Sequence, residues 1–132
     1  VTRVRKLFRE NANEYKAKAD TVSQAEIYRQ SYAISICTSE DIQSPTVIGA
    51  QAANELLNIR GIRASFVMTE YQGKIFVSAR SIDEVNVQII MERLGGGGHM
   101  NTAGCQMEGV GMAEAIGTLK ETIDIMIEEG AI

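Results

Sequence analysis

Residues 64–80, ASFVMTEYQGKIFVSAR, decide the fold of this 132-residue chain. Two apolar runs rich in β-branched and aromatic residues, 64–69 and 74–80, flank the dipeptide Gln72-Gly73. Such runs predict β-strands, and a short connection that contains glycine is typical of a hairpin turn. The stretch therefore predicts a β-hairpin.

The segment before the hairpin predicts a third strand and a crossover helix. Residues 33–37, AISIC, read as a strand. Ser44-Pro45 is a helix-start signal, because a hydroxyl can cap free N–H groups and proline is tolerated at the first helical position. We expect this helix to run to about Ile59 and to be closed by Gly61. Strand, helix and strand over 33–69 then form one right-handed crossover onto a sheet.

Apolar periodicity predicts the outer elements. They are a helix at 2–19 with a linker at 20–24, an edge strand at 25–29, a helix at 84–94 capped by Asp83, a strand at 103–108 and a final helix at about 111–129. The sum is an α/β fold with a small mixed β-sheet of four or five strands packed with helices, plus an N-terminal helix. We divide the chain into an N-terminal helix and linker, 1–24, and one domain, 25–132.

Composition narrows the classes of protein. The chain has 13 basic and 17 acidic residues and a net charge of −4, with 45% hydrophobic and 23% charged residues, as in an ordinary soluble domain. It has no Trp, four Tyr and three Phe, too few rings for an aromatic base-stacking platform. An acidic chain also argues against a broad nucleic-acid groove, which needs a basic face.

The first residue, the lack of long apolar runs and the two cysteines predict a cytosolic piece of a longer protein. The chain begins at Val1, which we interpret as a cut by processing or by design. It has no signal peptide, and no apolar run approaches the ~18–20 residues of a membrane span. Cys37 and Cys105 lack C-x-x-C spacing, so we expect reduced thiols in the core.

The most unusual feature is the run Gly95-Gly96-Gly97-Gly98, which ends at His99, the only histidine. Each glycine costs roughly 0.5–1 kcal/mol relative to alanine, so four in a row call for a function. A backbone without Cβ atoms can approach a ligand closely, and successive N–H groups can bind an anion. Residues 94–107 carry no charge that would repel a phosphate.

Nearby polar residues could complete an anion site. Asn101 and Thr102 follow the run and can hydrogen-bond a base or a ribose, and Arg80 ends the second strand of the hairpin. A charge-assisted hydrogen bond from Arg80 would contribute about 1.5–3 kcal/mol. Three alternatives without a binding function stay open. The glycines could be a flexible connector, His99 could be a structural residue, and Arg80 could form a surface ion pair with Glu92 or Asp83.

Several other kinds of site are not supported. One His and two distant Cys do not form a metal-ligand set. No Lys-Ser/Thr follows the glycines, which excludes a P-loop. No Ser-His-Asp constellation can be identified either, so we assign no catalytic and no metal-binding residue to this chain.

Residues 74–81, KIFVSARS, followed by a helix and residues 95–104, GGGGHMNTAG, resemble the DHH-associated domain, the C-terminal companion of the DHH phosphoesterase domain. Most of residues 1–130 is most similar to the cyclic-di-AMP phosphodiesterase (GdpP-type) branch. The resemblance implies that 25–132 is a substrate-binding domain. It also implies that the family's GGGH motif falls on Gly96, Gly97, Gly98 and His99, which hold the nucleotide against a metal centre.

The same resemblance implies further roles. Arg80 would face the phosphate and Asn101 would lie near the base, while Thr102 stands where family members often have alanine. Two divalent metals, usually manganese, would be held by Asp and His residues of a DHH domain in the parent protein. This chain would then be the cytoplasmic end of a bacterial protein anchored in the membrane through another region, without membrane contact of its own.

The leading hypothesis is the nucleotide-recognition subdomain of a metal-dependent cyclic-di-AMP phosphodiesterase that hydrolyses its substrate with a metal-bound hydroxide. Its partners would be the nucleotide, the DHH domain of the same chain and a second copy in a homodimer. One alternative keeps this architecture but acts on short oligonucleotides, as a nanoRNase or RecJ-like exonuclease. Others are a non-catalytic nucleic-acid-binding appendage, as in alanyl-tRNA synthetases, and a pure interaction module.

Overall fold

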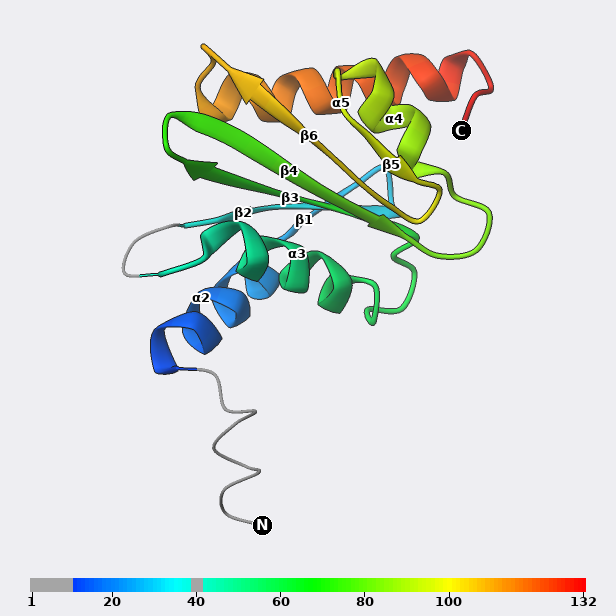
Figure 1. The fold of residues 1–132 in the computed structure, drawn as a ribbon. Coiled ribbons are helices and arrows are strands. Elements are labelled where there is room, and N and C mark those ends of the chain that lie inside the picture. The colour runs from blue at the N-terminus through cyan, green and yellow to red at the C-terminus, as the bar shows by residue number, and fades with distance from the viewer. Residues whose placement is uncertain (1–10, 39–41) are drawn as a thin grey trace.

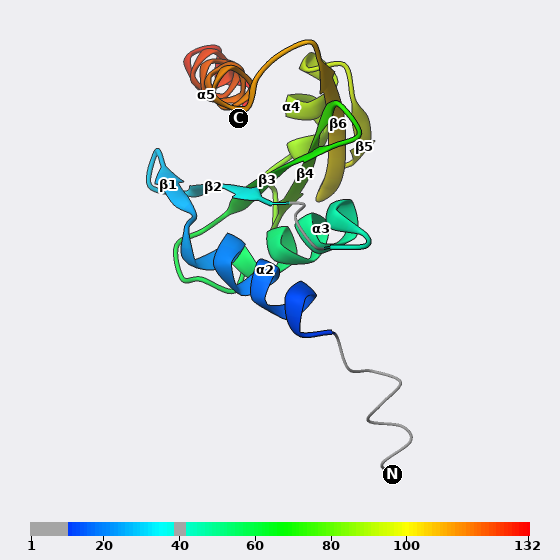
Figure 2. The same ribbon diagram turned by 90° about the vertical axis from the view of Figure 1, so that its left-hand side faces the viewer.

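A computed structural model describes residues 11–38 and 42–132 and has three layers. A central sheet of six strands, in the order β1-β2-β3-β4-β6-β5, separates α2 and α3 on one face from α4 and α5 on the other (Figures 1 and 2). The elements are α2 (Ala12–Ser23), β1 (Glu26–Tyr28), β2 (Tyr32–Cys37), α3 (Pro45–Leu56), β3 (Ala64–Tyr71), β4 (Lys74–Ser81), α4 (Val87–Arg93), β5 (Gly97–His99), β6 (Thr102–Glu108) and α5 (Met112–Glu128). The predicted α/β class and the mixed sheet are confirmed.

The hairpin of β3 and β4 forms as the sequence predicts. Gln72 and Gly73 have φ angles of 53° and 78°, and the ladder begins with the pair Tyr71 and Lys74. Positive φ angles at two consecutive residues are typical of a two-residue hairpin turn, and the twist of this turn matches that of the strands. The antiparallel register is thereby set from the turn.

Strand β2 pairs in parallel with β3, and α3 is the crossover between them. Proline stands in the first turn as predicted, but the side chain of Ser44 makes no capping hydrogen bond. The helix ends at Leu56, before the expected end at Ile59, because the N–H groups of Asn58 and Ile59 turn to carbonyls three residues back. Gly61, with φ of 91°, lies in the loop that follows.

Each face of the sheet has its own core. On one face, Phe66, Met68 and Val77 pack with buried residues of α4 and α5. On the other face, Val67 and Cys37 pack with Ile48, Ala52 and Leu56 of α3. The predicted apolar stripe of the last helix is confirmed, since Ala115, Leu119, Ile123 and Met126 are buried.

Two details of the outer elements differ from the prediction. The sheet has six strands, because residues inside the glycine run form the edge strand β5. Helix α2 continues through the expected linker to Ser23; Thr21 is buried, and its carbonyl accepts a 2.6 Å bond from the Ser35 hydroxyl of β2. The part of the predicted helix before residue 11 lies outside the described residues.

The start of α4 also differs from the prediction. Asn86, not Asp83, caps the helix, with its side-chain oxygen 2.9 Å from the amide nitrogen of Gln88. Asp83 has φ of 54°, whereas an N-cap residue adopts an extended backbone. The segment 82–86 is consequently a turn rather than helix.

Both cysteines are buried, with exposed fractions of 1% for Cys37 and 6% for Cys105, and both are free. Burial raises the pKa of the Cys37 thiol, and it raises the pKa of the Cys105 thiol to about 11, because a desolvated thiolate is disfavoured. No helix in the described part of the chain is long and apolar enough to cross a membrane.

We expect the protein to lose stability between pH 9 and pH 11 through Cys105. In the unfolded chain this thiol ionises near pH 9, whereas the folded protein keeps it protonated until about pH 11. The unfolded state then binds fewer protons, so the free energy of unfolding falls by about 2 kcal/mol over this window. Urea denaturation at both ends of the window should show a smaller fall for Cys105→Ala than for the wild type. An equal fall in the two proteins would contradict burial of the thiol.

Candidate functional site

The glycine run begins as the end of α4. The amide of Gly95 donates to Glu92 at 3.1 Å, and the amide of Gly96 donates to Met91 at 2.8 Å. With φ of 87° at Gly95, this pair of bonds is the Schellman motif that closes helices at a left-handed glycine. The first glycine is therefore explained by capping alone.

Gly96 and Gly98 let β5 approach β6 closely. A Cβ atom on Gly96 would overlap the carbonyl oxygen of Gly104 and lie 2.5 Å from the Cβ of Cys105. A Cβ on Gly98, which has φ of 144°, would lie 2.6 Å from the Cα of Ala103 and from the carbonyl oxygen of Thr102. No side chain fits at these two positions while the strands stay paired.

Gly97 differs from its neighbours. A Cβ atom there would meet nothing within 4 Å, and its φ is not in the left-handed region. Its partner in the ladder is Gly104 of β6, so two residues without side chains lie next to each other on the sheet. We call Gly97 and Gly104 the glycine floor; it lies on the face of the sheet that α3 covers.

The three predicted side chains Arg80, Thr102 and His99 lie in one row across β4, β6 and β5. Arg80 pairs with Thr102 in one ladder, and Thr102 pairs with His99 in the next. Directly opposed residues of antiparallel strands share a face of the sheet, with Cβ atoms about 4.5–5.5 Å apart. The structure thus brings together a cation, a hydroxyl and an imidazole beside the glycine floor.

Arg80 is half-buried, and within residues 11–38 and 42–132 it forms no ion pair. The expected alternatives Glu92 and Asp83 are therefore not its partners. Its Nη1 donates to the carbonyls of Ala79 at 2.9 Å and Ala103 at 3.4 Å. Burial lowers the pKa of the guanidinium, because desolvation disfavours the charged form. An anion at this position would stabilise the charge.

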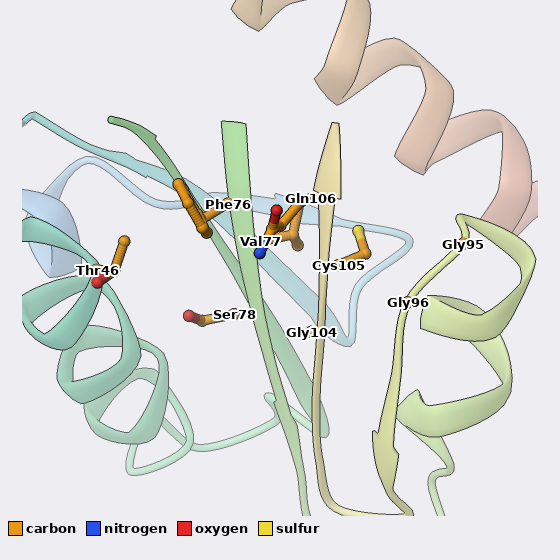
Figure 3. A pocket seen from close by; sticks show the side chains of 9 residues that line it. All are labelled: Thr46, Phe76, Val77, Ser78, Gly95, Gly96, Gly104, Cys105 and Gln106. Atoms are coloured by element: carbon orange, nitrogen blue, oxygen red, sulfur yellow. The ribbon is translucent and has the colours of Figure 1, made fainter. Parts of the chain in front are cut away.

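A pocket of about 420 Å³ lies beside this row, between the first turn of α3 and the glycine run (Figure 3). Its lining comprises Thr46, Phe76, Val77, Ser78, Gly95, Gly96, Gly104, Cys105 and Gln106. Of the residues predicted as the site, Gly96 alone is in this lining. The pocket runs along β4 and β6 away from the row, so the row and the pocket form two parts of one surface.

Sequence reasoning missed Phe76, Ser78 and Gln106. The alternation of burial in β4 puts Phe76, Ser78 and Arg80 on one face, and this period of two was visible in residues 74–80. The pairing of Phe76 with Gln106 was not visible, because it depends on the register between two strands separated by a helix.

Asn101 has structural partners. Its Nδ2 donates to the hydroxyl of Ser81 at 2.9 Å and to the carbonyls of Asp83 at 3.2 Å and Val85 at 3.3 Å. These bonds tie the turn between β5 and β6 to the loop before α4. A contact between Asn101 and a base stays a prediction.

The row of Arg80, Thr102 and His99 offers an anion one positive charge and several hydrogen-bond donors. In the described ranges, no three His, Cys, Asp or Glu residues gather where a metal ion could be held. Cys105, which lines the pocket, has a thiol that stays protonated at neutral pH. The two metals that the resemblance implies have no ligand set among these residues.

The glycines should differ in their effect on stability. Gly96→Ala should lower the free energy of unfolding by several kcal/mol, because its Cβ collides with the backbone of β6. Gly97→Ala should change it by less than about 1 kcal/mol, as should the control Gly117→Ala on the exposed side of α5. Denaturant unfolding measures all three, and equal losses at Gly96 and Gly97 would contradict this account of the run.

Comparison with known proteins agrees with these features. The family model of the DHHA1 domain matches residues 30–129. The cyclic-di-AMP phosphodiesterase PdeA of Listeria monocytogenes is 41% identical over 122 residues, which are 92% of this chain and 18% of that protein. The cyclic-di-AMP phosphodiesterase GdpP of Bacillus subtilis is 38% identical over 129 residues, 96% of this chain and 20% of that protein.

The chain spans about a fifth of the length of these curated relatives. Among solved structures, an exopolyphosphatase-related protein from Bacteroides fragilis superposes with a TM-score of 0.80 at 21% identity. The match covers 92% of this chain and 37% of that one, and it shows a shared fold. The resemblance predicted from the GGGH stretch is confirmed: the chain belongs to the DHHA1 domain family.

Proposed function

We propose that this domain binds the phosphate of a nucleotide phosphodiester and presents it to a catalytic domain of the same protein. The observation that carries the proposal is the row of Arg80, Thr102 and His99 beside the bare glycines. Arg80 is a desolvated cation without a carboxylate partner in the described structure. A phosphate oxygen is the ligand that this environment favours.

Each member of the row has a distinct task in this proposal. Arg80 supplies the charge, Thr102 supplies a hydroxyl, and His99 at the exposed edge strand supplies a ring N–H donor. The missing side chain of Gly97 lets the nucleotide lie against the backbone of β5. All of these are binding tasks, and none requires the domain to form or break a bond.

The substrate that we propose is cyclic-di-AMP. Support comes from two relatives, PdeA and GdpP, which are cyclic-di-AMP phosphodiesterases and resemble this chain at 38–41% identity over nearly its whole length. The catalytic domain would be a DHH domain that holds two divalent metals, which we expect to be manganese. Both domains would lie in the cytoplasm. We assign no step of the hydrolysis to the residues described here, because they contain no metal-ligand set.

Removing the row should impair hydrolysis by the full-length protein. Arg80→Gln and His99→Ala should each lower kcat/KM for cyclic-di-AMP by about 10- to 100-fold, since a charge-assisted hydrogen bond contributes about 1.5–3 kcal/mol. Steady-state kinetics with manganese provide the measurement. The matched control is Arg29→Gln, at the turn between β1 and β2 at the opposite edge of the sheet, which should keep wild-type kinetics.

Wild-type kinetics for both Arg80→Gln and His99→Ala would remove the row from the site. Circular dichroism and thermal unfolding of each variant separate a binding defect from loss of fold. Gly97→Val adds an independent test, because it places a side chain on the glycine floor at a position where a Cβ atom meets no other atom within 4 Å. Unchanged hydrolysis in Gly97→Val would favour a connector role for the run.

The domain alone should not hydrolyse the substrate. Residues 1–132 incubated with manganese and cyclic-di-AMP should give no more product than buffer, because the described residues lack both a metal-ligand set and a reactive thiol. Chromatographic detection of the linear dinucleotide measures this. Robust turnover by the isolated chain would contradict the division of labour proposed here.

A further inference from the structure

The pocket beyond the glycine floor ends at Phe76 of β4 and Gln106 of β6 (Figure 3). We infer that these two residues bind the base of the nucleotide whose phosphate lies at Arg80, and that Gln106 makes this base subsite prefer adenine to guanine. This inference rests on the proposed phosphate site. Phe76 supplies a stacking surface, and Gln106 supplies hydrogen bonds to the base edge.

The register of β4 and β6 places the parts of a nucleotide in the right order. Arg80 pairs with Thr102, Ser78 with Gly104, and Phe76 with Gln106, so three rows follow one another on one face of the sheet. At ~3.3 Å per strand residue, successive rows lie about 7 Å apart. If the phosphate binds at the row of Arg80 and Thr102, the sugar lies over Gly104, which has no side chain, and the base reaches the row of Phe76 and Gln106.

Charge changes along the same direction. The phosphate end has the unpaired guanidinium of Arg80. Beyond the base end, Lys74 and Glu108 pair with each other at 3.2 Å and neutralise one another. A nucleotide has the matching polarity, with its charge on the phosphate and a neutral base.

Phe76 is partly buried and held by a neighbour. The ring of Tyr71 packs against it at 6.4 Å between centroids, with an angle of 53° between the planes. A ring fixed in this way loses little freedom when a base stacks on it, and stacking on an aromatic side chain tolerates any base. Phe76 therefore accounts for affinity without selectivity.

Gln106 is exposed at the pocket, and its side-chain amide forms no hydrogen bond with any other residue that the structure describes. An amide presents one acceptor and two donors, so it can pair with the N6 amino group of adenine and the adjacent ring nitrogen. The N7 edge of guanine offers two acceptors and no donor, so the amide can bond only one of them. This difference is the basis of the predicted preference.

The test removes the hydrogen-bonding groups of Gln106 at nearly constant side-chain size. In the full-length protein with manganese, kcat/KM is measured for cyclic-di-AMP and for cyclic-di-GMP. Gln106→Met removes the amide, so a bound adenine loses two hydrogen bonds whereas a bound guanine loses one. We expect the adenine-to-guanine ratio of kcat/KM to fall by about tenfold or more. Phe76→Leu should lower kcat/KM for both substrates and leave the ratio unchanged.

The control is Gln30→Met, which removes the same amide at the exposed turn between β1 and β2 and should keep the wild-type ratio. An unchanged ratio in Gln106→Met, with Arg80→Gln still defective, would overturn the base subsite and leave the phosphate site intact. If the wild type hydrolyses neither substrate, or if Arg80→Gln behaves as wild type, the proposed function fails and the base subsite fails with it.

Discussion

The contact between the backbones of β5 and β6 is the constraint on which the rest of the site depends. At Gly96 and Gly98 the two strands lie so close that a Cβ atom would collide with main-chain atoms of β6. This contact holds β5 in register, and the register places His99 beside Thr102 and Arg80. The run therefore has two parts: Gly95 and Gly96 close α4, and Gly97 and Gly98 belong to the edge strand β5, which lies close to β6. Gly97 is the position where the same absence of a side chain faces open space.

The second constraint is electrostatic. The chain has a net charge of −4, yet the pocket and the row take their residues from β4, from Thr46 of α3 and from residues 94–107, a stretch without formal charge. Arg80 is desolvated by the sheet and receives no carboxylate from the described residues. An overall acidic protein can thus bind an anion, because the field at a half-buried site depends on its nearest charges.

Elements with strong local signals could be predicted from the sequence. The hairpin around Gln72-Gly73 and the stripe on α5 follow from turn chemistry and periodicity, and both are confirmed. Strand β5 could not be predicted, since glycine has low β propensity and the strand exists only through its contact with β6. The same holds for the last turns of α2, which the bond from Ser35 to the carbonyl of Thr21 helps to hold.

The candidate site also contains residues that the sequence predicts and residues that only the structure reveals. The GGGH stretch identified His99 and the glycines, and the strand end identified Arg80, but their alignment in one row required the register of three strands. Phe76 and Gln106 carry no motif, and only the pairing of β4 with β6 brings them together. Asn101 carried a plausible signal, while the structure occupies its amide nitrogen with three acceptors near α4. The partners of a polar residue near a motif can thus be named only once the structure is known, and a contact between Asn101 and a base stays a prediction.

Phosphate binding by Arg80 and His99 can be observed in a crystal structure of the full-length protein bound to a phosphorothioate analogue of cyclic-di-AMP, which resists hydrolysis. We expect one phosphate within hydrogen-bonding distance of Arg80 and His99, with its nucleotide lying over Gly97 and Gly104. A nucleotide bound elsewhere on this domain, or one whose phosphates touch neither Arg80 nor His99, would contradict it.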